Sequence, residues 1–211
     1  MPVIASQLGF AIETPLVSPQ SPNFRPPRWP PPTNFPIAID ANGNVVCRYG
    51  DCRWNLWPWA GKSLTLNFGD GPQREGVPPI TAENANLLRQ IAAWWLFGPR
   101  GVRSVGDLDH RFKLIRPLFI HCSRHGISAA QASRYPAVCD SLPSLLAPST
   151  ATGFLAQLHN LFQERDFLGF TLLDRESLRR LEAALPEHYE RQTPYIPPRI
   201  WSYQNRRLRP F

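Results

Sequence analysis

The stretch ITAENANLLRQIAAWWLFGPRG, residues Ile80–Gly101, carries the clearest structural pattern of the chain. Its apolar side chains recur at the spacing of one helix face, at Leu87, Leu88, Ile91, Trp94 and Trp95. Thr81 stands where such a helix is capped, and Gly98, followed by a proline, stands where it ends. The stretch therefore predicts an amphipathic helix with one buried face.

The next stretch, VRSVGDLDHRFKLIRPLFIHCSRHGIS at Val102–Ser128, predicts a second and longer helix. Ser104 or Asp107 caps its start, and Gly126 ends it. Pro117 should kink or split it, because a proline removes one backbone donor. A second apolar stripe has the same helical period, with the residues Leu108, Phe112, Ile115, Phe119 and Cys122.

Shorter helices follow these two. A third helix stops before Pro136, because the residue that precedes a proline avoids helical backbone angles. A fourth runs from Ser149 or Thr150 to Leu168, and another short one opens at Asp174. The fourth helix has an apolar face formed by Phe154, Leu158, Leu161 and Phe162. The fold class expected from these patterns is mainly α, a bundle of four or five helices.

A proline-rich leader, residues 1–36, precedes the helices. It holds ten of the 24 prolines of the chain, including the run RPPRWPPP at Arg25–Pro32. Such a composition favours extended polyproline II conformation and does not build a packed core. We expect a stiff leader, with a ligand for a proline-binding module as the alternative.

Residues 37–80 predict a small β element, because short apolar runs alternate there with turn residues. Asn42-Gly43 between two such runs indicates a hairpin, since both residues tolerate the positive φ of a tight turn. Three tryptophans follow, Trp54, Trp57 and Trp59. We expect them in the core, although clustered tryptophans can also stack on nucleic-acid bases.

The charge of the chain points to a polyanionic partner. The formal net charge is +7 and the pI about 9.7, which makes nucleic acid the first candidate. The basic residues are 21 Arg and only 2 Lys. Arginine suits contacts with phosphates and guanine edges, but the codon usage of a GC-rich genome explains the ratio as well. Codon usage does not explain the net charge.

The cationic residues gather in two segments. Between Arg100 and Arg134 there are seven of them and two acids, and the basic C-terminal segment from Arg199 contains no acid. Helices can project such side chains together toward phosphates, whereas a merely soluble basic surface is the simpler alternative. The candidate DNA contacts are Arg100, Arg103, Arg111, Lys113, Arg124, Arg199, Arg206 and Arg207.

Catalytic and metal chemistry have little support in the sequence. His121 and His125 have the spacing of a zinc pair on a helix, but no acidic residue lies between them and the cysteines match no common finger. We therefore expect no metal, no cofactor and no catalytic residue. Four cysteines are too few for a disulfide scaffold, and neither a convincing signal peptide nor a membrane-spanning stretch is present. The expected location is the cytoplasm.

The order of these parts, together with the later stretches TATGFLAQLHNLFQERDF (Thr150–Phe167) and TPYIPPRIWSYQNRRLR (Thr193–Arg209), resembles the N-terminal part of tyrosine recombinases. This is the phage-integrase family, and the likeness is to the larger integrases of bacterial mobile elements. The resemblance implies that residues 81–170 form the core-binding (SAM-like) domain that grips double-stranded DNA. Residues 171–211 are then a linker and the start of a truncated catalytic domain.

The sharp motifs of that family are catalytic: an arginine, a lysine, His-x-x-Arg, a later His or Trp, and a tyrosine. The chain stops before the segment where they would lie, so the resemblance implies a DNA-binding portion that is not catalytic by itself. His121–Arg124 fits His-x-x-Arg only as a string, in the wrong half. Self-association on DNA is expected of the full-length protein. The alternative is a protein-interaction module that uses the proline-rich leader and the tryptophans.

Overall fold

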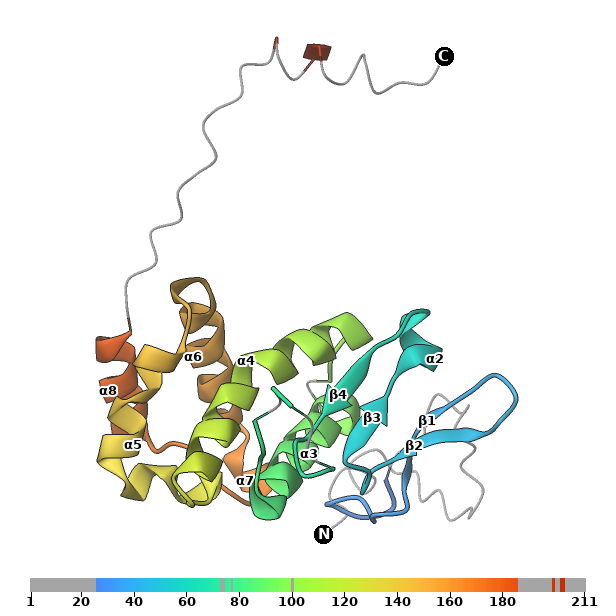
Figure 1. The fold of residues 1–211 in the computed structure, drawn as a ribbon, viewed down its shortest axis with the longest axis horizontal. Coiled ribbons are helices and arrows are strands. Elements are labelled where there is room, and N and C mark those ends of the chain that lie inside the picture. The colour runs from blue at the N-terminus through green and yellow to red at the C-terminus, as the bar shows by residue number, and fades with distance from the viewer. Residues whose placement is uncertain are drawn as a thin grey trace.

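The computed structural model describes residues 26–72, 75–76, 78–99 and 101–185, together with residues 199, 202 and 203. The fold is mixed, with a mostly helical part and two small antiparallel sheets (Figure 1). The N-terminal elements are β1 (Pro36–Ile39), β2 (Val45–Arg48), β3 (Arg53–Asn55), α2 (Trp57–Ala60) and β4 (Thr65–Asn67). The helical elements are α3 (Ala82–Phe97), α4 (Val105–Arg124), η1 (Ala129–Arg134), α5 (Pro136–Asp140), η2 (Leu142–Leu145), α6 (Pro148–Gln163), α7 (Arg165–Leu168) and α8 (Arg175–Ala184).

The first sheet is the hairpin expected at Asn42-Gly43, with β1 antiparallel to β2. Its turn is organised by Asp40, whose Oδ1 accepts hydrogen bonds from the backbone N–H groups of Asn42 at 2.9 Å and Asn44 at 2.8 Å. Within this turn Gly43 has a positive φ, 85°, and Asn42 does not, while the aspartate carboxylate stabilises the loop. These bonds also hold the pKa of Asp40 below its usual value.

The second sheet pairs β3 with β4, and α2 forms the connection between them. Trp54 is fully buried, packs edge-on against Phe68 with ring centroids 4.9 Å apart, and donates from Nε1 to the Tyr49 carbonyl at 3.2 Å. Trp57 and Trp59 are 45% and 44% exposed. The expectation of a core position is therefore right for Trp54 and wrong for the other two, because α2 is a single turn without a buried residue.

The two long helices follow their sequence patterns. In α3 the predicted stripe is buried at Leu88, Ile91, Trp94 and Trp95, and the helix ends at Gly98. Helix α4 begins after Ser104, whose hydroxyl accepts from the Asp107 backbone N–H at 3.1 Å, and its whole predicted stripe is buried. Pro117 lies inside the helix without splitting it, so the helix remains continuous from Val105 to Arg124.

The later helices differ from expectation in two places. The third predicted helix is the 3-10 helix η1, and two short elements that were not predicted, α5 and η2, follow it before α6. The helix predicted to reach Leu168 is interrupted at Glu164, which separates α6 from α7. The Glu164 carboxylate accepts a hydrogen bond from the Trp94 indole N–H and so joins this junction to α3. Helix α8 begins as expected at Asp174, whose carboxylate accepts from the Ser177 N–H at 2.8 Å.

One hydrophobic cluster connects these elements, α2 excepted, from Phe35 beside β1 to Leu181 in α8. It crosses the boundaries expected after residues 36, 80 and 170. The end of the proline-rich leader takes part in it, since Trp29 packs edge-on against Trp94 with ring centroids 5.3 Å apart. Helix α8, expected in a linker, packs against α5 and α6. The strands and the helices therefore share a single core.

Helix α4 lies in the middle of this arrangement, between the strands on one side and α5, α6 and α8 on the other (Figure 1). In the part of the chain that the structure describes, no helix combines the length and the apolar character needed to cross a membrane.

Candidate nucleic-acid interface

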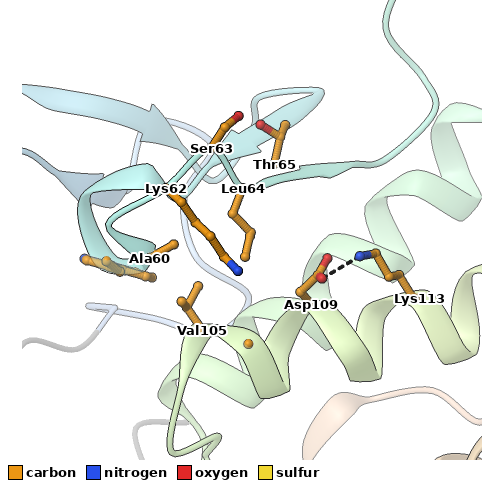
Figure 2. Close-up of a pocket in the computed structure, with 10 residues that line it drawn as sticks. Ala60, Lys62, Ser63, Leu64, Thr65, Val105, Asp109 and Lys113 are labelled. Carbon is orange, nitrogen blue, oxygen red and sulfur yellow. Dashed lines mark hydrogen bonds and ion pairs between the residues drawn. The ribbon is translucent and has the colours of Figure 1, made fainter. Parts of the chain in front are cut away.

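A groove of about 510 Å³ lies between the α2–β4 connection and the first turns of α4 (Figure 2). Residues 59, 60 and 62–65 line one side of it, and Val105, Gly106, Asp109 and Lys113 line the other. The two sides are distant in sequence, so the groove exists only because β4 and α2 pack near α4. Its volume is in the range of sites that bind small molecules or single groups of a polymer.

Both lysines of the chain, Lys62 and Lys113, line this groove. Lys113 Nζ donates to Asp109 Oδ2 at 2.6 Å, one helical turn away, and its side chain is 71% exposed. Figure 2 shows the Lys62 side chain reaching across the groove toward α4, on the side of Asp109. Two ammonium groups and one carboxylate give the groove a net positive charge, and an exposed lysine–aspartate pair remains open to competing anions.

The first turn of α4 strengthens the attraction for anions. Val105 and Gly106 belong to this turn, where backbone N–H groups point outward and the helix dipole is positive. One of these donors, that of Asp107, is already used by Ser104. Phosphate groups are the anions that helix starts bind most commonly.

An exposed aromatic ring completes the groove. Trp59 is one of its lining residues, and Trp57 lies on the same turn of α2 but does not line it. The Trp59 ring is 44% exposed, so part of its face is open to a ligand in the groove. The groove thus combines positive charge with an aromatic surface.

The structure brings only some of the predicted DNA contacts together. Arg103 is exposed, two residues before Val105 of the groove, and Lys113 lies in the groove itself. Arg111 is half-buried and lies two residues from Lys113, so it faces another side of α4. Arg124 is exposed about 16 Å further along the axis, since each helical residue adds about 1.5 Å.

The remaining predicted contacts are not in this group. Arg199 is exposed, but most of its neighbours lie outside the described residues. Arg100, Arg206 and Arg207 lie outside them as well.

Some cations of the chain stabilise the fold instead of forming basic surface. Arg116 is half-buried and donates from Nε to the Asn67 carbonyl of β4 at 3.1 Å, and burial lowers its pKa. Arg89 is buried in α3 and paired with Asp70. Lys62 was not among the DNA contacts predicted from the sequence. Its position directly after Gly61, close to the exposed tryptophans, is the feature of the sequence that could have indicated it.

The two histidines with the spacing of a zinc pair, His121 and His125, have other partners. The ring of His121 is buried, and its Nε2 lies 2.8 Å from Ser141 Oγ and 3.1 Å from the Val138 carbonyl. His125 packs edge-on against it with ring centroids 4.6 Å apart. Burial lowers the pKa of His121, as do the neighbouring charges of His125 and Arg124. Among the described residues, no three His, Cys, Asp or Glu side chains come together as metal ligands.

Comparison of the chain with family models, with curated proteins and with solved structures finds no match.

Proposed function

We propose that this chain is the DNA-binding portion of a site-specific tyrosine recombinase, an integrase of a mobile genetic element, acting in the cytoplasm. In this proposal residues 81–170 are the core-binding (SAM-like) bundle, and the groove beside α4 faces duplex DNA. No residue of the chain is given a catalytic role. The full-length protein would associate with further copies of itself on DNA.

The observation that carries this proposal is the convergence of positive groups at the start of α4. Lys62 and Lys113 line one groove from two separate segments, and exposed Arg103 lies two residues before the helix begins. The phosphate backbone supplies most of the attraction in protein–DNA complexes, and lysine, arginine and helix starts are the groups that contact it. The net charge of +7 favours the same class of partner.

A salt titration tests the proposal. Each phosphate contact releases counterions from duplex DNA, so the logarithm of affinity falls by about 0.9 per contact and per tenfold increase in salt. Three contacts predict a slope of about −2.7. The measurement is fluorescence anisotropy of a labelled duplex between 50 and 200 mM salt. A folded protein that binds no duplex at the lowest salt would contradict the proposal.

The exposed tryptophans favour a second candidate, a protein-interaction module. Trp57 and Trp59 are both exposed, and α2 has no buried residue. Their rings therefore form apolar surface on which another protein could dock. Such binding would change little with salt, because apolar contacts release no counterions. The same titration therefore distinguishes the two candidates.

A further inference from the structure

Trp59 is held in place by the backbone around it rather than by burial of its own ring. Its N–H donates to the Leu56 carbonyl at 3.1 Å, and the Leu56 N–H donates to the Leu64 carbonyl at 2.8 Å. Leu56 is itself fully buried. The turn is thus fixed at both ends by the pairing of β3 with β4, while the indole of Trp59 remains 44% exposed beside the groove.

The charges of the groove give a free anion only a modest net attraction. Lys62 and Lys113 carry two positive charges and Asp109 carries a negative one, so the net charge of the three is +1. Lys113 is already engaged by Asp109. A phosphate alone would gain attraction from the lysines and meet repulsion from the carboxylate. A tightly bound ligand has to use the aromatic ring as well.

An unpaired nucleotide has the required groups. Its base has a flat face for the Trp59 ring, its phosphate is an anion for the lysines, and the amino groups of bases can donate to a carboxylate such as that of Asp109. Stacking on aromatic side chains beside a cationic groove is the way in which proteins hold single strands. Inside a duplex both faces of each base are covered by neighbouring bases, so away from the duplex ends Trp59 can stack only where a base is unpaired.

We propose that the groove between α2, β4 and α4 binds an unpaired nucleotide of a DNA strand, with its base on Trp59 and its phosphate between Lys62 and Lys113. This site rests on the proposed function and adds a preference to it. The chain should bind a duplex that continues into a single strand more tightly than a blunt duplex.

Trp57 is a matched control for this proposal. It lies on the same turn, is 45% exposed and has the same side chain, but it does not line the groove. Residues two apart on a helical turn face different sides, so a base that reaches Trp59 in the groove does not stack on Trp57. Neither tryptophan belongs to the hydrophobic cluster, and each substitution should leave the fold intact.

The experiment compares two labelled probes by anisotropy, a blunt duplex and the same duplex with a thymidine tail of about six nucleotides. For the unaltered chain we expect the tailed probe to bind about 5- to 150-fold more tightly, the range of one stacked base. Trp59→Ala should abolish this difference by weakening the binding of the tailed probe. Trp57→Ala should preserve the difference, and circular dichroism establishes that both variants are folded.

Two results would overturn the proposal while leaving duplex binding in place. One is equal affinity of the unaltered chain for the two probes. The other is an equal loss in Trp57→Ala and Trp59→Ala, which would mean that the tail does not enter the groove. Failure of the folded chain to bind either probe at low salt would instead refute the proposed function, and this site with it.

Discussion

Arg89 in α3 and Asp70 in the loop after β4 form a buried ion pair. The guanidinium also donates to the Asp51 carbonyl at 3.0 Å and to Asn86 Oδ1 at 2.7 Å, and it lies over the Phe68 ring at 5.0 Å. All of its nitrogens therefore have partners, as a buried arginine requires. The pair joins the strand-rich segment to the helices and fixes the position of β4, which lines the groove.

Removal of Asp70 should destabilise the protein strongly. Asp70→Ala leaves the Arg89 charge buried without its counterion, and breaking a buried pair in this way costs about 3–5 kcal/mol. Urea unfolding at neutral pH measures the change. Asp166→Ala is the control, because Asp166 is 80% exposed and pairs with Arg165 at 3.8 Å, a surface contact expected to contribute less than about 1 kcal/mol. Similar losses in both variants would contradict a special role for the buried pair.

Phe112 should be essential for the core. It is buried in α4 and packs edge-on against Phe68 with ring centroids 5.4 Å apart. Phe112→Ala should cost about 3–5 kcal/mol of unfolding free energy, as expected for a buried aromatic side chain. Phe167→Ala, at an exposed ring stacked on Trp94, should cost no more than about 1.5 kcal/mol. A loss below about 1 kcal/mol at Phe112 would mean that this face of α4 is not packed.

The stability of the fold should decrease on mild acidification. Burial lowers the pKa of His121 from its ordinary value of 6.5, so the native state binds less proton at this site than the unfolded chain. Its contribution is present above pH 6.5 and is lost as the pH falls through 6.5 toward the lowered native value. Asp40 and Asp174 have lowered pKa values, so their protonation decreases the stability only below about pH 4. Urea midpoints between pH 7.5 and 5 should decline, and His121→Gln should reduce that decline. An equal decline in the variant would assign the effect to another group.

Arg103 and Arg111 should differ in their effect on DNA binding. Arg103 is exposed beside the groove, whereas Arg111 is half-buried on another side of α4. In the salt titration with duplex DNA, Arg103→Ala should reduce the magnitude of the slope by about 0.9, and Arg111→Ala should leave it unchanged. The reverse order of effects would place the DNA on the opposite side of the helix.

Local signals in the sequence were sufficient for α3, α4, α8 and the first hairpin, but not for the short elements α2, α5 and η2. Ser104 and Asp174 cap α4 and α8 through side-chain hydrogen bonds, and Gly98 ends α3, because each of these features depends only on residues within one turn. The interruption at Glu164 was missed, since no glycine or proline marks it and its side chain bonds to Trp94 far away in the sequence.

The groove could not be predicted in the same way. It requires Lys62, from an irregular connection, to lie near Lys113 of α4, and only long-range packing decides this. The tryptophans show the same limit, because three similar residues within six positions have opposite environments. Their apolar side chains predict a position in the core for all three. The backbone of the β3–α2–β4 connection decides which of them is buried. The predicted excess of surface charge was likewise reduced by Arg89 and Arg116, which bond within the fold.

The most direct test of DNA binding through the groove is the salt slope of a double variant, Lys62→Ala with Lys113→Ala. The charge-matched control is Arg175→Ala with Arg179→Ala, on exposed positions of α8 at the other end of the molecule (Figure 1). If both lysines contact phosphates, the first variant reduces the magnitude of the slope by about 1.8, twice the value for one contact, and the control leaves it unchanged. Equal slopes for the lysine variant and the unaltered chain would contradict DNA binding at this groove.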